Sequence, residues 1–142
     1  MDGKKRYKAY KRGQVLFVDF GKRPPGVEGG LRPCVVVSCD KSNHAGAPQI
    51  TVCPLSSKLK QIPVHVQIRP EDVNGYSLKN GSDLLPEDIQ TISKSAVRGE
   101  LGYISNNSEV MMKIDYALCM QFGLLEKCVA EGMEKHGYEK GR

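Results

Sequence analysis

Short runs of apolar residues, separated by glycine, proline and polar residues, predict a succession of β-strands between residues 14 and 93. The runs lie at 14–20, 32–39, 49–55, 63–68, 84–85 and 90–93. Most are rich in β-branched residues, which favour strands. The run 63–68 alternates between apolar and polar residues, which is typical of a strand with one buried face.

One later stretch has the periodicity of a helix. Apolar residues recur at helical spacing over 110–125. Asn106, followed three residues later by Glu109, predicts a capping box at the start of this helix. Gly123 predicts its end, although the apolar pattern runs on towards Cys128.

The fold class that these elements predict is mainly β, an α+β chain. Closely spaced short strands predict a small curled antiparallel barrel, and the amphipathic helix near the C-terminus is expected to cover it. The 142 residues suffice for one domain with its own core. We expect residues 13–125 to form this domain, with residues 1–12 as a basic arm and residues 126–142 as a charged tail.

The surplus positive charge lies in the arm. The formal net charge is +5, and residues 1–12 account for all of it, with six Lys or Arg against one Asp. The rest of the chain is balanced. A basic arm can contact phosphates or can simply be solvated, and the sequence leaves both open.

Several classes of protein are excluded by the same inspection. No run of about 18 apolar residues is present to span a membrane, and no apolar stretch follows the charged N-terminus as in a secretory signal. A cytoplasmic protein is therefore predicted. Five Cys without a C-x-x-C pair and three scattered His predict reduced core thiols and no metal site. No cofactor motif is found, so none is expected.

The most informative segment is Glu-Gly-Gly-Leu-Arg-Pro at 28–33. Gly29 and Gly30 carry no Cβ, so their backbone N–H groups can approach a ligand closely. Pro33 favours an extended conformation at Arg32, at the start of a predicted strand. A guanidinium there can bind a phosphate through two N–H groups and stabilise charge during phosphoryl transfer. The alternative is a loop arginine that is solvated or paired with an acidic neighbour.

Ser56 is a second candidate. It follows the strand 49–55 and is close in sequence to Lys58 and Lys60. A hydroxyl beside two cations suits a phosphate, although serine at the end of a strand also commonly forms a turn. No His or Asp is spaced to activate Ser56 as a nucleophile. His44 has the chemistry of a general base, but a histidine in a polar turn is usually only solvated.

Taken in order, these segments resemble the MazF/PemK toxin family. The resemblance extends from about Arg12 to Leu124, and its most specific element is Gly-Gly-x-Arg-Pro at 29–33. The matching segments are RGQVLFVDF (12–20), EGGLRPCVVV (28–37), ITVCPLSS (50–57), PVHV (63–66), LLPEDIQTI (84–92) and the end of the helix, with Ala117-Leu118 and Phe122-Gly123-Leu124.

The resemblance implies an endoribonuclease of a toxin–antitoxin pair, built as an SH3-like barrel with a helix and working as a homodimer in the cytoplasm. Members cleave single-stranded RNA, typically mRNA, at short sequences without a metal. The 2′-hydroxyl attacks its own phosphate and leaves a 2′,3′-cyclic phosphate and a 5′-hydroxyl. The expected partner besides RNA is a cognate antitoxin, an acidic and largely disordered chain that folds on binding.

By the same resemblance, particular residues take functional roles. Arg32 takes the place of the catalytic arginine, and Ser56 stands where many relatives carry Thr. Some relatives place a catalytic acid near Glu87. The residues expected to contact RNA are Glu28, Gly29, Gly30, Ser57, Lys58 and Gln90. Gln90 and Ser93 stand where the family often has Arg and Asp, which replaces an ion pair or a substrate contact by neutral groups.

Two other functions stay open at this point. The same barrel serves CcdB-like toxins, which bind DNA gyrase without nuclease activity, and a catalytically decayed member would only bind partners. Replacement of Arg32 by Ala separates them, because only a ribonuclease loses its toxicity.

Overall fold

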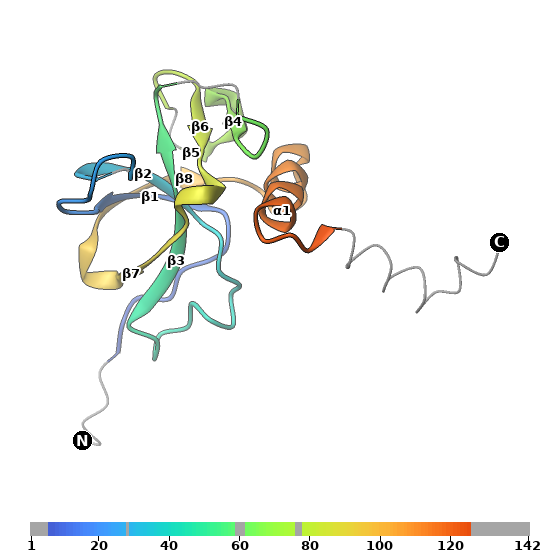
Figure 1. Ribbon diagram of the computed structural model, residues 1–142. Helices are drawn as coiled ribbons and strands as arrows, with labels where there is room; N and C mark the ends of the chain where they lie inside the picture. Colours follow the sequence, from blue (N-terminus) through green and yellow to red (C-terminus); the bar gives the residue numbers. More distant parts are fainter. Residues whose placement is uncertain (1–5, 28, 59–61, 76–77, 126–142) are drawn as a thin grey trace.

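The computed structural model describes residues 6–27, 29–58, 62–75 and 78–125. Within these ranges the chain forms a series of short strands followed by one α-helix (Figure 1), so the expected fold class is confirmed. The strands are β1 (Gln14–Asp19), β2 (Leu31–Val36), β3 (Gln49–Ser56), β4 (Val66–Ile68), β5 (Asn74–Gly75), β6 (Ser82–Leu84), β7 (Gln90–Ser93) and β8 (Val97–Tyr103). The helices are α1 (Glu109–Gln121) and the short 3-10 turns η1 (Pro70–Asp72), η2 (Pro86–Asp88) and η3 (Lys94–Ala96).

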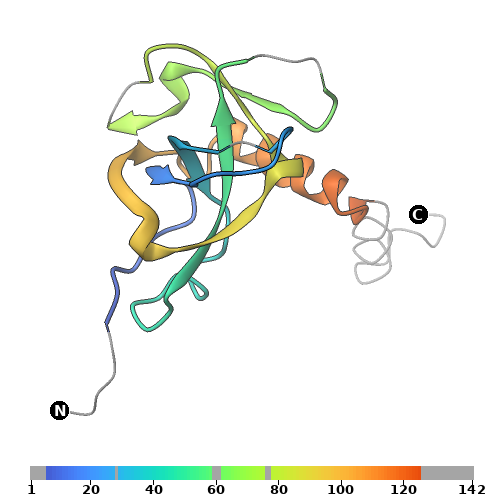
Figure 2. The ribbon, with the colours of Figure 1, turned by 60° about the vertical axis from the view of Figure 1, so that its left-hand side comes forward.

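The sheet is antiparallel and curls around β3. Its strands follow the order β4-β6-β3-β2-β1-β8-β5, and β7 also pairs with β3. The first residues of β3 pair with β7 and its middle pairs with β2, whereas its last two residues, Leu55 and Ser56, pair with β6. Figure 2 shows this long strand running through both halves of the sheet. Because β3 changes partners along its length, the sheet bends into a half-barrel.

The core has two parts, one on each side of β1 and β2. Val15 and Val35 belong to the part that also holds Met111 and Ile114 of α1. Leu16 belongs to the other part, inside the curl of the sheet. Alternate side chains of a strand point to opposite faces, so the apolar runs in β1 and β2 are continuous because both faces are covered.

Helix α1 begins later than predicted. Ser108 is the N-cap, and its Oγ accepts a hydrogen bond of 3.1 Å from the backbone N–H of Met111. The predicted capping box of Asn106 with Glu109 is therefore wrong, because Asn106 lies in the turn that precedes the cap. The predicted end is confirmed, since Gly123 has a φ of +66° just after the C-cap Phe122.

Two strands are shorter than their apolar runs. The strand predicted at 63–68 is confined to Val66–Ile68, because Pro63 cannot donate to a ladder and the N–H of His65 closes a turn on the carbonyl of Ile62 at 2.9 Å. The strand predicted at 32–39 ends at Val36. There the hydroxyl of Ser38 accepts from the N–H of Thr51, which replaces a regular ladder bond.

The prediction of core thiols is confirmed for Cys34 and Cys53 and wrong for Cys39, which is exposed in a turn. Cys119 is half-buried, and Cys128 lies outside the described residues. Burial strongly raises the pKa of Cys34. Burial, with a smaller contribution from the charge of Glu87, raises the pKa of Cys53 to about 12.

The described end of the N-terminal arm packs on the body of the protein. The backbone N–H groups of Tyr7 and Tyr10 donate to carbonyl groups of the turn at 43–45. The ammonium group of Lys94, a residue that is 7% exposed, lies 5.7 Å from the ring of Tyr10. In the described parts of the chain, no helix combines the length and the apolar character needed to cross a membrane.

Candidate active site

Arg32 and Ser56 lie at the same end of two neighbouring strands. Cys34 of β2 is paired with Pro54 of β3. Arg32 comes two residues before Cys34 and Ser56 comes two residues after Pro54, so both lie just beyond this end of the β2–β3 ladder. Two candidates that lie far apart in the sequence are thus brought to one edge.

The glycine pair holds the loop that carries Arg32. Gly30 has a φ of +74°, which favours glycine, and its N–H donates to the carbonyl of Gly21 at 2.8 Å. A Cβ on Gly29 would lie 2.8 Å from the same Gly21 carbonyl oxygen. The carbonyl of Gly29 in turn accepts a hydrogen bond of 2.9 Å from Nε of Arg32, so the loop orients the guanidinium.

Ser56 is the last residue of β3 and is buried. Its Oγ accepts a hydrogen bond of 3.2 Å from the N–H of Lys58, which fixes the turn after the strand. Ser56 is also the cross-strand partner of Asp83 in β6, and Gln67 of β4 is the next partner in that row. Directly paired side chains lie on one face, so Ser56 and Asp83 share a face.

His65 connects Asp83 to Glu87. Its Nδ1 lies 3.3 Å from Oδ2 of Asp83, and its Nε2 lies 2.5 Å from Oε2 of Glu87. The side chains of His65 and Asp83 are 4% and 8% exposed, whereas that of Glu87 is 39% exposed. The row therefore leads from a buried carboxylate, through a buried imidazole, to a carboxylate at the surface.

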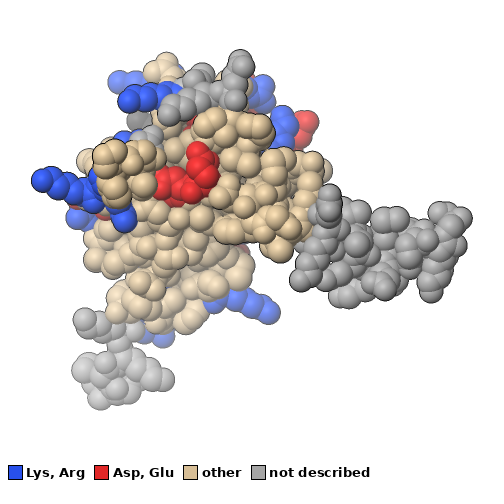
Figure 3. Space-filling view, viewed as in Figure 1, with Lys and Arg blue, Asp and Glu red and all other residues tan. Residues whose placement is uncertain are grey.

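A small pocket of about 260 Å³ collects several of these groups. It is lined by Gly26, Val27, Ser56, Lys58, Ile62, His65, Leu85 and Glu87. Gly26 and Val27 come from the loop before β2, and the other residues come from the β3, β4 and η2 region. Figure 3 shows acidic side chains near the middle of this face, with Lys and Arg around its edge. The pocket thus offers a hydroxyl, an ammonium group and a carboxylate to one ligand.

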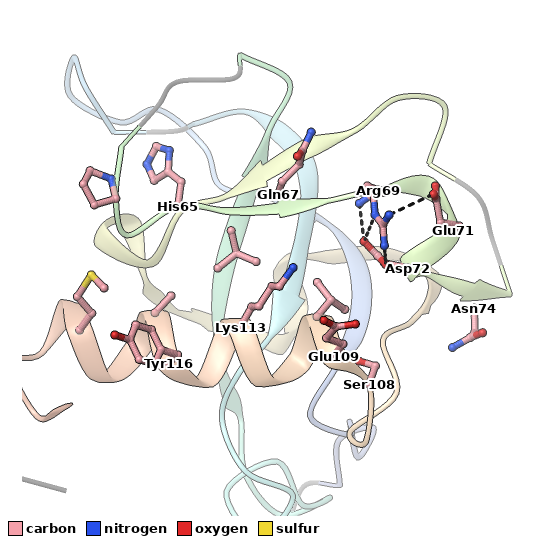
Figure 4. Close-up of a pocket in the computed structure, with 15 residues that line it drawn as sticks. His65, Gln67, Arg69, Glu71, Asp72, Asn74, Ser108, Glu109, Lys113 and Tyr116 are labelled. Carbon is pink, nitrogen blue, oxygen red and sulfur yellow. Dashed lines mark hydrogen bonds and ion pairs between the residues drawn. The ribbon is translucent and has the colours of Figure 1, made fainter. Parts of the chain in front are cut away.

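A second hollow, of about 760 Å³, lies between β4 and α1 (Figure 4). Lys113 of α1 points toward β4 across it, and Arg69 is paired with Asp72 at its edge (Figure 4). None of Arg32, Ser56 and Glu87 lines it. Ser56 and Glu87 line the smaller pocket instead.

Comparison with known proteins fits the curled antiparallel sheet with its helix. The family described as "PemK-like, MazF-like toxin of type II toxin-antitoxin system" matches residues 11–122. The chain belongs to this family. The resemblance to MazF/PemK toxins noted from the sequence is thereby confirmed.

Individual proteins similar to this chain belong to the same kind of toxin or endoribonuclease. Endoribonuclease EndoA of Bacillus subtilis (strain 168) is 30% identical over 118 residues, which cover 82% of this chain and 97% of EndoA. An endoribonuclease in complex with its cognate antitoxin, from a Mycobacterial species, superposes with a TM-score of 0.65 at 27% identity, over 82% of this chain and 97% of that one. MazF of Deinococcus radiodurans shares the fold, with a TM-score of 0.63 at 19% identity, over 82% and 98% of the two chains.

Of the other described residues expected to contact RNA, Lys58 lines this toxin's pocket. Ser57 and Lys58 are exposed just beyond β3. Gln90 lies farther away, because it pairs with Val52, four residues before Ser56 on β3. Its Nε2 donates to Oδ1 of Asp88 at 3.1 Å. Glu28 lies outside the described residues.

Inspection of the sequence did not identify His65 and Asp83. The alternating pattern at 63–68 puts His65 on the polar side of its segment, which was the available signal. Its partners Asp83 and Glu87 come 18 and 22 residues later in the chain. The contacts therefore become visible only once β4 is paired with β6 in the folded protein. His44, in contrast, is exposed, and its Nδ1 accepts from the N–H of Gly46. Among the residues described, no group of three His, Cys, Asp or Glu is arranged to hold a metal ion.

Proposed function

We propose that this protein is the endoribonuclease toxin of a toxin–antitoxin pair and cleaves single-stranded RNA, such as mRNA, in the cytoplasm. Two observations support the proposal. Arg32 and Ser56 both lie just beyond the same end of the β2–β3 ladder, and Ser56, Lys58 and Glu87 line one pocket. These groups suit a phosphodiester, because a guanidinium and a hydroxyl can both donate to its oxygens.

The reaction that we propose is transfer of the phosphoryl group to the neighbouring 2′-oxygen. The 2′-oxygen forms a bond to phosphorus, the bond from phosphorus to the 5′-oxygen breaks, and the products are a 2′,3′-cyclic phosphate and a 5′-hydroxyl. Arg32 and Ser56 would donate hydrogen bonds to the non-bridging oxygens, whose negative charge grows in the transition state. The sequence led us to expect Glu87 as a catalytic acid. With its Oε2 held by His65, we propose instead that Glu87 accepts the proton of the 2′-hydroxyl.

The glycine-closed loop at 21–30 supports the proposal in a second way. It orients Arg32 through the carbonyl of Gly29 and supplies Gly26 and Val27 to the wall of the pocket. Lys22 and Arg23 lie in the same loop, and their exposed side chains can attract the RNA backbone. We propose Gly29, Gly30, Ser57, Lys58, Glu28 and Gln90 as further RNA contacts.

The partners proposed are RNA, a second copy of the chain and a cognate antitoxin, as in the Mycobacterial complex. The domain that carries the activity is proposed to be residues 13–125, with the arm at 1–12 and the tail at 126–142 as additions. No cofactor or metal has a role in the proposed chemistry.

Substitutions of Arg32 test the assignment. Purified protein is incubated with a long single-stranded RNA in EDTA, and cleavage rates are compared for the wild type, Arg32→Ala and Arg32→Lys. We expect Arg32→Ala to lose about 100-fold or more, and Arg32→Lys to lose most of the activity because it cannot bind a phosphate through two parallel N–H groups.

Arg98→Ala is the matched control. Arg98 is an exposed arginine of β8, 3.9 Å from Asp19, and two strands separate β8 from β3. The Arg98→Ala variant should cleave RNA at the same rate as the wild type. If Arg32→Ala retains full activity, or if the wild type leaves the RNA intact, the assignment is wrong. Growth inhibition that survives in Arg32→Ala would point instead to the gyrase-binding alternative.

A further inference from the structure

Asp83, His65 and Glu87 form a continuous polar row that ends at the pocket. The two outer carboxylates contact different nitrogens of one imidazole, at 3.3 Å and 2.5 Å. Asp83 and His65 are shielded from solvent, and only Glu87 reaches the surface. Lys58 is the cation that lines the same pocket.

The geometry determines which hydrogen bonds the row can make. A carboxylate only accepts, and an imidazole with hydrogen on both nitrogens donates from both. In that form His65 donates Nδ1–H to Asp83 and Nε2–H to Glu87. The buried charge of the imidazolium is then compensated by Asp83 behind it and Glu87 in front, as buried charges require.

From this row we infer that His65 and Asp83 are positioning residues for Glu87 in the RNA-cleaving reaction. The inference rests on the proposed function. His65 holds Oε2 of Glu87 and leaves Oε1 for the substrate, and Asp83 fixes the orientation of the imidazole ring, as second carboxylates do in other histidine-containing sites.

Oε1 of Glu87 takes the proton of the 2′-hydroxyl while the 2′-oxygen bonds to phosphorus, so the carboxylate becomes a neutral carboxylic acid. The electron pair of the broken bond leaves on the 5′-oxygen, which takes a proton from water. His65 and Asp83 keep their protonation states throughout, so they act through Glu87.

A double-mutant cycle tests this dependence. Single-turnover cleavage rates are measured for the wild type, His65→Gln, Glu87→Gln and the double variant. We expect Glu87→Gln to lose about 100-fold, and His65→Gln to lose about 10-fold or more because it acts only through Glu87. The double variant should lose no more than Glu87→Gln alone. Losses that multiply would overturn the inference.

The pH profile separates positioning from a structural role. His65→Gln and Asp83→Asn both alter the hydrogen bonding and charge beside Glu87, so the acidic limb of the cleavage pH profile should move in both variants, whereas a merely structural role would leave the limb in place. His44→Gln, a matched change at an exposed histidine, should leave the profile unchanged. If His65→Gln lowers the cleavage rate at every pH and leaves the acidic limb of the pH profile in place, the inference is overturned.

Folding and the basic activity need separate controls. Circular dichroism and thermal unfolding establish that each variant is folded. Glu87→Gln changes an exposed side chain, so it tests the role of Glu87 even if a buried variant is unstable. A wild type that cuts no RNA overturns the proposed function. A wild type that cuts RNA, with a fully active Glu87→Gln, overturns only the row.

Discussion

Ser56 of β3 and Asp83 of β6 are cross-strand partners at the point where the sheet bends. This pairing places the hydroxyl expected to bind phosphate on the same face as the carboxylate that holds His65. The end of β3 therefore serves two functions. It continues the ladder into the second half of the barrel, and it brings Ser56 beside the row that ends at Glu87.

We expect RNA cleavage to depend on the hydroxyl group of Ser56. We expect Ser56→Ala to lower the RNA cleavage rate by roughly 10- to 100-fold, because it removes a donor to the developing negative charge. Ser56→Thr keeps the hydroxyl and should retain most of the activity. Rates on a single-stranded RNA at saturating protein measure both. Equal loss in the two variants would mean that packing of the buried side chain, rather than the hydroxyl, is responsible.

The parts that could be predicted from sequence are those encoded locally. The Gly-Gly-x-Arg-Pro motif led to Arg32, and the apolar runs led to the strands on either side. The contacts of His65 could not be predicted, because they depend on the β4–β6 register and on η2. The N-cap of α1 was misplaced because Asn106 and Ser108 are both good capping residues, and the turn at 105–108 selects Ser108.

Gly13 is a position at which the backbone requires glycine. Its φ is +97°, and a Cβ there would lie 2.4 Å from the carbonyl oxygen of Ile104. Gly13→Ala should lower the free energy of unfolding by about 2–3 kcal/mol, through strain and displacement of β8. At Gly21 the φ is +68°, but an added Cβ would have no neighbouring heavy atom within 4 Å. Gly21→Ala should therefore lower the free energy of unfolding by only about 1 kcal/mol. Urea unfolding measures the free energy of unfolding of both variants. Equal losses in the two would contradict a clash between a Cβ at position 13 and the carbonyl of Ile104.

Lys94 links stability to pH. Burial lowers its pKa from the ordinary 10.5, so the native state releases this proton before the unfolded state does. The desolvation cost is fully present at neutral pH and disappears as pH rises towards 10.5. Its Nζ donates to the carbonyl of His44 at 2.8 Å. Lys94→Met should therefore be less stable by about 1 kcal/mol, and the deficit should grow as pH rises to 10.

Unfolding by urea at pH 7 and pH 10 measures this difference. Lys41→Met, a change at an exposed lysine, provides the reference. A deficit for Lys94→Met that stays constant or shrinks with pH would contradict the sign of the effect.

The described thiols differ in reactivity. Cys39 is exposed, and hydrogen bonding to Ser42 lowers its pKa. Cys34 and Cys53 are buried with raised pKa values. We expect iodoacetamide at pH 8 to label Cys39 in the folded protein and to reach Cys34 and Cys53 only after unfolding. Peptide mass spectrometry reads the sites, with Cys39→Ser as control; rapid labelling of Cys34 in the native protein would disagree with the packing of β2.

The central claim is cleavage by attack of the 2′-oxygen, with Arg32 and Ser56 at the phosphate. The most direct test is the chemical identity of the ends that the wild-type protein leaves on a long single-stranded RNA in EDTA. Attack by the 2′-oxygen leaves a 2′,3′-cyclic phosphate on one fragment and a 5′-hydroxyl on the other, and these are the ends that we expect. Fragments with a 3′-hydroxyl and a 5′-phosphate would contradict this claim, because they require attack by water from the opposite side of the phosphate.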